Sequence, residues 1–523
     1  MASALSDSVG VVRGVKVKTV LGESAFKFRS FRYRERLGQP FEGVLDVIGG
    51  DSHVDLGKLL GTTVTVSVPL PAGGTRHFSG VCLEARQTGG EGNAFAYQLT
   101  MVPWLRLLAL GSTGQIFQNK TVQQVLGDVF DGLGFSDYDL SGIQGSLPTL
   151  DFCVQYNETF LNFVDRLTQK FGISYHAKHS DGGHRMIFAD TGAVYVPVTD
   201  LYDIIHYAAN PADAAAGREH IHSWEPVQRM ESGRFVLKDY AFTDPSANLE
   251  TRDSAGHAYP HGDLEMFEYP GGFQKKSDGD TLARIRLGVL TCGQSLIVGE
   301  GRCYGLSAGS TFQLKGHPRQ DQNASYLTTA IDFSLEPAGG SGGGRGADAF
   351  ACTCSFEAIP AGVDYRPKRT AFIPRIDGVQ TAVVVGPAGQ DPQVPYTDKY
   401  GCVKVQFRWD RNGQNDEQSS CWVRHKQVYA GSGWGATFLP TVGCEVVVAF
   451  EEGCPERPVV LGGVYNASNK PPRDLPDHAV KTVIQDPAGN FAVLDAQAGK
   501  ESITVRTAYK NNWRMIGDCS EPD

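Results

Sequence analysis

The sequence lacks the excess of positive charge, the long apolar runs and the paired ligand motifs that mark several large classes of protein. Lysine and arginine number 48 against 58 aspartates and glutamates, so the net charge is −10. Nucleic-acid binding relies on basic side chains that neutralise phosphates, and this balance argues against nucleic acid as a partner. The longest apolar runs, such as residues 446–450, are strand-sized and far shorter than the roughly 20 residues that span a bilayer.

A secretory signal is also missing, because residues 1–20 hold no basic segment followed by an apolar stretch of about ten residues. The eleven cysteines are an odd number and are scattered, which favours free thiols in a reducing cytosol. Cys352 and Cys354 lack the second ligand pair that a zinc site needs. His220 and His222 lie on one face of a predicted strand without convincing further ligands, so we expect no metal and no cofactor.

Catalytic chemistry is not indicated either. We expect no nucleophile elbow of the G-x-S-x-G type, no H-E-x-x-H helix and no P-loop. The acidic pairs Glu451 with Glu452 and Asp398 with Asp410 could serve a glycosidase at the right separation, but they lie in strand-turn segments where exposed carboxylates are common. We therefore predict no catalytic residues and no enzyme activity.

Glycine is abundant: 62 of 523 residues, about 12% against roughly 7% on average. Together with 10% aromatic residues, this favours turn-rich β-structure. Residues 11–100 read as short alternating strands separated by turns with Gly and Pro, and strand patterns return from 173 to 336. The length predicts three or four domains of about 100–200 residues each.

Three helices interrupt this pattern. Residues 121–134 carry apolar side chains at helical spacing behind Thr121 as an N-cap. A second apolar stripe runs through 157–172, with Asn157 and Glu158 at its start and a glycine after its end. A third helix is predicted at about 278–290.

Composition also predicts the boundaries of the domains. Six of the twelve residues in 337–348 are glycine, which indicates a flexible linker. From residue 479 onward, apolar and polar residues alternate strictly, as in β-strands. An isolated ribbon of such strands buries too little apolar surface to be stable, so we expect this tail to need partner chains. The expected parts are a first hub β-barrel subdomain at 1–120, helices and a second β-barrel subdomain at 121–336, a Gly-rich linker at 337–364, a compact barrel at 365–472, and the start of a β-needle at 473–523.

At residues 365–472 a long ordered pattern, including YTDKYGCVKVQFRWDRNG and PERPVVLGGVYN, closely resembles the VgrG family of type VI secretion spike proteins. Upstream, VQYNETFLNFVDRLTQKFGISY is similar to the hub region of that family. The family in turn resembles the fused hub and spike proteins of contractile phage tails. The motif positions are Asp398, Tyr400, Gly401, Lys404, Phe407, Trp409, Asp410, Trp422, Trp434, Gly443, Glu445, Pro455, Arg457, Pro458, Gly462 and Asn466.

The resemblance implies structural roles for these positions. Tryptophans and Phe438 are expected to anchor the core or a trimer interface, and the charged positions are expected to form surface or intersubunit pairs. Three positions depart from the family pattern: Cys402 replaces the usual Arg, Cys444 the usual Gln, and Cys454 the common Asp. We expect these swaps to place thiols near the barrel surface.

The implied fold is mainly β with a few helices: a hub of two related β-barrel subdomains, an OB-like β-barrel, and a C-terminal intertwined β-needle in a homotrimer. The implied function is structural. Such a spike caps a hexameric Hcp-like tube, contacts baseplate proteins, carries a PAAR-like tip protein or effector, and meets the target-cell membrane on ejection. It is assembled in the bacterial cytoplasm and secreted by the contractile machine.

Two alternatives remain open at the level of sequence. One is the spike of an extracellular contractile injection particle or phage-like tail. The other is an OB protein that binds a glycan or a nucleic acid, since OB folds often bind such ligands. Trimerisation distinguishes a spike of either kind from a binding module, because a binding module would act as a monomer.

Overall fold

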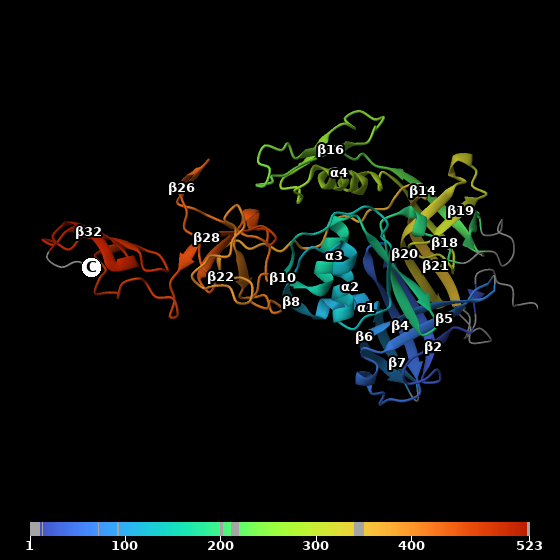
Figure 1. Cartoon of the computed structure of the whole chain (residues 1–523). Coiled ribbons are helices and arrows are strands. Elements are labelled where there is room, and N and C mark those ends of the chain that lie inside the picture. The colour runs from blue at the N-terminus through green and yellow to red at the C-terminus, as the bar shows by residue number, and fades with distance from the viewer. Residues whose placement is uncertain are drawn as a thin grey trace, which may run out of the picture. The chain divides into compact units, whose positions relative to one another are not determined.

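A computed structural model covers the chain and describes residues 11–12, 14–71, 73–91, 94–198, 202–210, 219–338 and 350–519 (Figure 1). The chain divides into two compact units. Unit 1 comprises Met1–Ser112, Thr121–Thr149 and Thr159–Phe372, and unit 2 comprises Thr113–Lys120, Leu150–Glu158 and Ile373–Asp523. The chain therefore passes between the units five times, and neither unit is one continuous segment.

Unit 1 contains a closed barrel. Its strands follow the order β21-β18-β14-β13-β19-β20, and β20 also pairs with β21, which closes a ring of six. These strands are β13 (Ile204–Tyr207), β14 (His220–Gln228), β18 (Ser295–Arg302), β19 (Thr311–Lys315), β20 (Ser325–Pro337) and β21 (Phe350–Pro360). Alternate residues of β21 are buried, as expected for a strand with one face toward a barrel core.

A half-barrel continues the same sheet from β20, in the order β3-β4-β7-β6-β5-β2. Its strands are β2 (Lys16–Lys18), β3 (Phe26–Arg36), β4 (Gln39–Gly49), β5 (Thr63–Pro69), β6 (Thr75–Glu91) and β7 (Ala94–Val102), and β1 (Val11–Val12) pairs with β21. The alternating burial along β3 and β4 follows their sequence pattern. Unit 1 therefore holds a closed barrel and a half-barrel that meet at β20.

The predicted helices form. Thr121 caps α2 (Val122–Gly132) in a capping box, in which Thr121 Oγ1 accepts from the Gln124 N–H and the Gln124 side chain accepts from the Thr121 N–H. The cap of α3 (Phe160–Lys170) is Thr159, whereas Asn157 and Glu158 belong to the preceding strand. The other helices are α1 (Trp104–Leu107) and α4 (Lys276–Thr291). Among the described residues, no helix is long and apolar enough to cross a membrane.

Two small sheets complete unit 1. Side chains of the sheet β11-β12-β9 hydrogen-bond to α2 and α3, through Tyr138 to Asp131 and through Tyr175 to Asp165, and the sheet β16-β15-β17 packs against α4. Their strands are β9 (Tyr138–Gly142), β11 (Ser174–Ser180), β12 (Gly183–Ala189), β15 (Arg234–Lys238), β16 (Glu250–Ser254) and β17 (Glu265–Glu268).

Unit 2 contains a five-stranded sheet with the order β23-β22-β27-β28-β24, and a small hairpin of β25 and β26. The strands are β22 (Gln380–Val385), β23 (Lys404–Phe407), β24 (Arg424–His425), β25 (Tyr429–Gly431), β26 (Trp434–Ala436), β27 (Glu445–Phe450) and β28 (Pro458–Val464). A bridge between Val403 and Val423, beside β23 and β24, closes this sheet into a barrel, and valines of β22, β23 and β27 form much of its core.

The core of unit 2 also includes side chains from the first third of the sequence. β8 (Ser112–Phe117) pairs with β10 (Cys153–Thr159). Phe152 and Val154 are buried in the same cluster as the valines of β22 and β27, and Ile116 and Tyr156 pack against it. The compact barrel expected at 365–472 is therefore incomplete without the β8–β10 ribbon.

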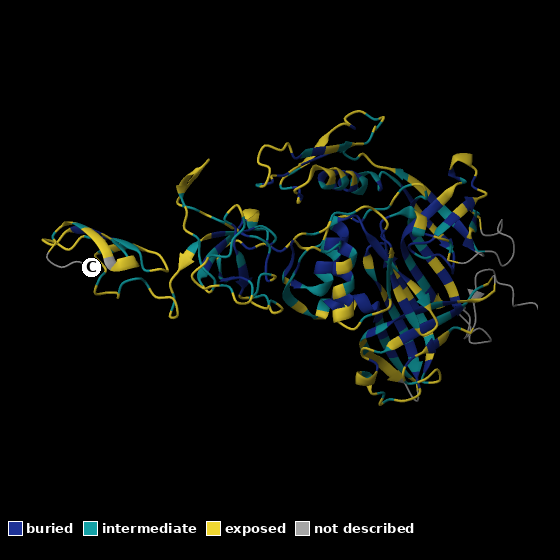
Figure 2. Cartoon of the chain, viewed as in Figure 1, coloured by how far each residue is buried: buried dark blue, intermediate teal, exposed yellow. Residues whose placement is uncertain are grey.

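A separate four-stranded antiparallel sheet ends the described chain. It follows the order β29-β30-β31-β32. The strands are β29 (Lys481–Gln485), β30 (Phe491–Asp495), β31 (Ser502–Thr507) and β32 (Asn512–Gly517). Figure 2 shows that buried residues fill the barrels, whereas this sheet is mostly exposed or intermediate.

The linker expected at 337–364 is wrong over much of its length. Residues 339–349 lie outside the described residues, but Phe350–Pro360 forms β21, which pairs with β18 and β20 in the closed barrel. The alternating apolar pattern of this strand begins directly after the glycine-rich run. Unit 1 accordingly extends to Phe372 rather than ending at 336.

Replacing Phe152 with Ala tests the role of the β8–β10 ribbon. We expect the Phe152→Ala variant to lose about 3 kcal/mol of stability in unit 2, because a buried aromatic ring leaves a cavity among the barrel valines. Hydrogen exchange should accelerate in peptides of β22 and β27. As a control, Phe188→Ala in β12 should accelerate exchange in unit 1 instead. Unchanged exchange in β22 and β27 of Phe152→Ala would contradict the shared core.

Candidate functional site

Trp409 and Phe407 form the aromatic centre of the unit 2 barrel. Phe407 is buried, and Trp409 stacks on it with ring centroids 5.2 Å apart. Trp409 Nε1 donates to Gln380 Oε1 at 2.8 Å, and Tyr156 of β10 meets the Trp409 ring edge-on at 5.4 Å. These two motif residues therefore hold the β8–β10 ribbon to the barrel, which fits the core role expected for Trp409.

Lys404 and Trp422 come together on one side of the same barrel. Lys404 Nζ donates to the Ser420 carbonyl at 2.6 Å and lies 5.0 Å from the centroid of the Trp422 ring. Partial burial lowers the pKa of Lys404. Within its own chain the ammonium thus contacts a carbonyl and an aromatic face, and the surface or intersubunit pair expected for it stays a prediction.

Glu445 does form an ion pair. Its carboxylate lies 3.4 Å from Arg408 Nη2 and accepts a hydrogen bond from Asn466 Nδ2 at 2.7 Å. The hydrogen bond from Asn466 is the main cause that lowers the pKa of Glu445. Because Asn466 lies two residues after the end of β28, this contact fixes the point where the chain leaves the barrel.

Asp398 stabilises a turn instead of pairing with a cation. Its Oδ1 accepts from the backbone N–H groups of Tyr400 and Cys402, at 2.9 and 2.8 Å. Gly401 lies in this turn with a φ of +76°, a conformation that glycine adopts without strain. Cys402 is buried, so the expectation that its thiol lies near the surface is wrong, and burial raises its pKa to about 12.

The remaining motif positions are spread over the barrel and do not meet in one cluster. Asp410 accepts from Gln406, Gly443 and Gly462 have positive φ, and Trp434 and Phe438 are exposed. Pro455 and Pro458 are buried, and Arg457 is partly buried. Cys444 packs partly against the core and Cys454 is partly buried.

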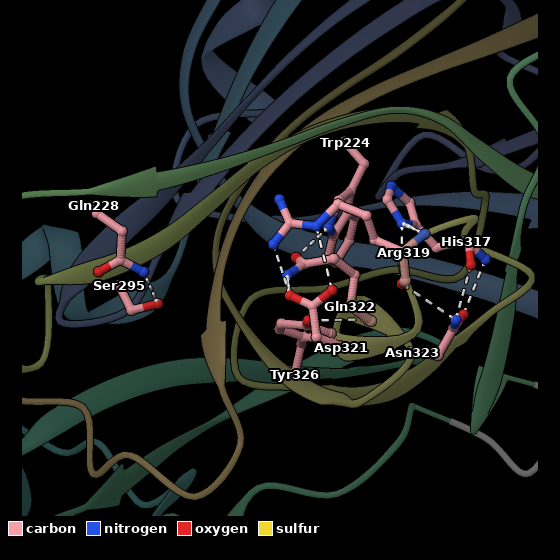
Figure 3. A network of polar contacts seen from close by, with 9 residues as sticks. All are labelled: Trp224, Gln228, Ser295, His317, Arg319, Asp321, Gln322, Asn323 and Tyr326. Carbon is pink, nitrogen blue, oxygen red and sulfur yellow. Dashed lines mark hydrogen bonds and ion pairs between the residues drawn. The ribbon is translucent and has the colours of Figure 1, made fainter.

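A polar loop at one end of the closed barrel is a site that the sequence motifs did not indicate (Figure 3). Trp224 of β14 donates from Nε1 to Gln322 Oε1 at 3.0 Å. Tyr326 Oη donates to the Gln322 carbonyl at 3.0 Å. Gln322 is buried, and these two aromatic residues fix the loop between β19 and β20 onto the barrel wall.

The rest of this loop is cross-linked by its own side chains. Asn323 Oδ1 accepts from the His317 N–H, and Asn323 Nδ2 donates back to the His317 carbonyl, both at 2.9 Å. Arg319 and Asp321 form an exposed ion pair at 2.7 Å. The exposed ion pair therefore lies on a loop whose shape is fixed by its own hydrogen bonds.

The expectation that the sequence lacks a G-x-S-x-G motif was wrong. Residues 305–309 read G-L-S-A-G and match the G-x-S-x-G spacing. The structure places them in a loop between β18 and β19 instead of the strand-to-helix turn of a hydrolase. Ser307 Oγ accepts from Arg76 Nη2 at 3.0 Å, so the motif joins the half-barrel to the closed barrel.

A buried polar group lies beneath this contact. Tyr33 Oη and His179 Nε2 are 2.8 Å apart, and the backbone N–H of Ser79 donates to His179 Nδ1 at 3.1 Å. Glu35 Oε1 accepts from the Ala177 N–H at 3.4 Å. Burial raises the pKa of Glu35 to about 7, and burial also places the pKa of His179 well below its usual range.

The paired histidines and the paired carboxylates considered in the sequence lie in different units. No group of three or more His, Cys, Asp or Glu side chains in the described part of the chain could hold a metal ion. His220 and His222 lie side by side in β14, with ring centroids 6.3 Å apart. Glu451 pairs with Arg424 at 3.5 Å on the surface.

Two family models match the chain. The model described as phage tail baseplate hub (GPD) matches residues 34–338, which is more than half of the chain. The model described as type VI secretion system/phage-baseplate injector OB domain matches residues 393–465. The first match falls mostly in unit 1 and the second in unit 2.

The curated relatives of the chain include type VI secretion system spike proteins. The chain is 36% identical over 472 residues to the type VI secretion system spike protein VgrG1b of Pseudomonas aeruginosa, which covers 90% of this chain and 62% of that protein. It is 33% identical over 476 residues to VgrG1a of the same organism, covering 90% of this chain and 72% of that protein. The chain thus spans less than two thirds of the length of VgrG1b.

A solved structure shows the same fold. The E. coli c3393 protein, described as a type VI secretion component similar to the T4 bacteriophage tail proteins gp27 and gp5, superposes with a TM-score of 0.60. The match covers 86% of this chain and 99% of that chain at 19% sequence identity.

Replacing Glu35 with Gln tests the buried polar group through its pH dependence. The folded pKa of Glu35, about 7, lies above its ordinary value of 4.5, so the contribution of Glu35 to wild-type stability falls as pH rises from 4.5 to 7. Glu35→Gln should therefore raise the free energy of unfolding by about 3 kcal/mol at pH 8 and by little near pH 4.5. Denaturant titrations at pH 5 and pH 8 measure this. The exposed Glu42→Gln serves as the control, and an equal effect of Glu35→Gln at both pH values would contradict the assignment.

Proposed function

The chain belongs to the VgrG family of type VI secretion system spike proteins, and from this premise we propose that it acts as the structural hub and spike of a contractile type VI secretion machine. In this proposal unit 1 is the hub, the barrel of unit 2 is the OB-type neck, and the terminal sheet begins a needle built by three chains.

The terminal sheet supplies the observation that carries the proposal. Leu494, Ile503 and Ile516 are cross-strand neighbours in one row, and Ile484 and Val505 lie on the same face. All five side chains are about half exposed in the single chain. An apolar sheet face of this kind needs a cover, and two further copies of the same sheet would bury it and pair its free edges.

The proposed mechanism is mechanical. Three copies of a hub with a barrel and a half-barrel present six related surfaces, which suits docking onto a hexameric Hcp-like tube. The closely hydrogen-bonded loop at 317–323 is one rigid element that such docking could use. Intertwined strands would then transmit the thrust of contraction along the needle without a large globular core.

The proposed partners follow from the ends of this assembly. The hub end would meet the tube and the baseplate proteins, and the needle end would carry a PAAR-like tip protein or an effector. The target-cell membrane would be met on ejection from the bacterial cytoplasm. We propose no catalytic step in this process, because the family role of the matched part is structural and its motif residues serve packing and turns.

Solution mass tests the trimer. The full chain should run at about 170 kDa by light scattering, three times its 56.5 kDa. Ile503→Asp should dissociate it, because the substitution places a charge on the face that becomes buried between copies. Ala498→Asp, in an exposed turn of the same sheet, adds the same charge away from that face and should leave the mass unchanged. A monomeric wild-type chain would contradict the proposed spike.

Secretion tests the machine. Deleting the gene should abolish release of the Hcp-like tube protein into the medium, because the tube lacks its cap. Complementation with the wild-type gene should restore release, and Ile503→Asp should restore little. Undiminished release in the deletion strain, when no second family member is encoded, would separate this chain from the secretion machine.

A further inference from the structure

A short aromatic hairpin, which we call the arm, extends beyond the body of the unit 2 barrel (Figure 1). The arm spans residues 427–438 and contains β25 and β26. At its base, Gln427 Oε1 accepts from the Phe438 N–H at 2.8 Å, and Gln427 Nε2 donates to the Phe438 carbonyl at 3.3 Å. This side chain closes the hairpin where the two strands leave the barrel.

The arm is ordered by its own aromatic rings. Tyr429 and Trp434 have ring centroids 4.7 Å apart. The indole of Trp434 also covers Gly431, where an added Cβ would come within 2.3 Å of the ring. The two rings are therefore held in place before any partner binds, and such preorganised aromatic side chains lose little entropy on association.

Four apolar side chains of the arm are exposed to solvent in the single chain. Val428 is 83% exposed, Tyr429 61%, Trp434 56% and Phe438 51%. Figure 2 shows the arm as an exposed extension. No charged residue occurs from 427 to 438. A two-stranded hairpin is marginally stable alone, so four exposed apolar side chains on it indicate a contact surface.

A matching surface lies on the outer part of β28. Val459 and Val460 pair with residues of β24. In the described part of the chain, β27 is the only strand that pairs with Val464. Leu461, Val464 and Tyr465 are exposed there. Like the arm, residues 458–466 carry no charged side chain. The two surfaces are thus matched in their apolar, uncharged character.

We propose that the arm of one protomer packs on the outer part of β28 of the next protomer. The inference rests on the proposed trimer and adds the contact that orders its barrels. Because the arm and the β28 surface are different patches, the contact is head-to-tail, and a head-to-tail contact closes in a ring such as a three-fold one. The aromatic pair Tyr429 and Trp434 would then be the hot spot of this interface.

A glycan is the competing occupant of exposed aromatic rings. Ligand sites of that kind combine apolar walls with a few convergent polar side chains that set the orientation. Between the two ends of the arm, the polar side-chain groups are the hydroxyls of Tyr429, Ser432 and Thr437 and the indole N–H of Trp434, and none of them is charged. The chemistry of the arm therefore favours an apolar protein surface.

The first test compares full-length variants by mass measurement over a dilution series. The double variant Tyr429→Ser, Trp434→Ser should dissociate at a concentration higher than the wild type by about tenfold or more. Val394→Ser is the matched control, since it removes a half-exposed apolar side chain from the same unit outside the arm. The control should dissociate like the wild type.

The second test leaves the aromatic residues intact. A photoreactive benzoylphenylalanine at Ser432, the tip of the arm, should give a covalent dimer on a denaturing gel, joined to a peptide containing residues 458–466. A wild-type trimer with unchanged dissociation in the double variant and cross-links elsewhere would overturn the arm contact and leave the spike proposal standing. Loss of binding to an immobilised glycan array in the double variant, with unchanged mass, would likewise overturn it. A wild-type monomer would overturn both.

Discussion

The strand β20 is the constraint on which the hub depends. Along one edge it pairs with β21 over nearly its whole length. Along the other edge it pairs first with β19 through Leu327, and then with β3 from Ala330 onward. A bulge at Thr329 separates these two stretches, and the Thr329 carbonyl accepts from the Leu37 N–H at 2.9 Å. One strand thus closes the first barrel and begins the half-barrel, so neither can shift register without the other.

The unit 2 barrel and the loop at 305–309 also depend on side chains from distant segments of the chain. The unit 2 barrel is completed by a ribbon that precedes it by more than two hundred residues, with Phe152 and Val154 in its core and Tyr156 against Trp409. The hub loop at 305–309 is tied to the half-barrel by Arg76. Because side chains of one segment complete the core of another, the chain is unlike a string of independent domains, and this interdependence suits the mechanical role that we propose.

The positions of some candidate site residues follow from the local sequence pattern, whereas the positions of others depend on distant segments. Motif residues with local roles, such as Asp398 in its turn and Phe407 in the barrel core, lie where a strand-and-turn pattern places them. Lys404 does not follow that pattern, since its partners Ser420 and Trp422 come from another segment. The loop fixed by Trp224 has no short motif at all, because its hydrogen bonds join β14 to residues almost one hundred positions away.

The sequence by itself determined the mainly β class, the three longer helices and the family, because each depends on local periodicity or on a long ordered pattern. Only the tertiary structure decided that β21 is a barrel strand, that β8 and β10 complete the barrel of unit 2, and that Glu35 is buried. Periodicity reveals which face of an element is apolar. It does not reveal which distant element covers that face, since burial is a property of the pair in contact.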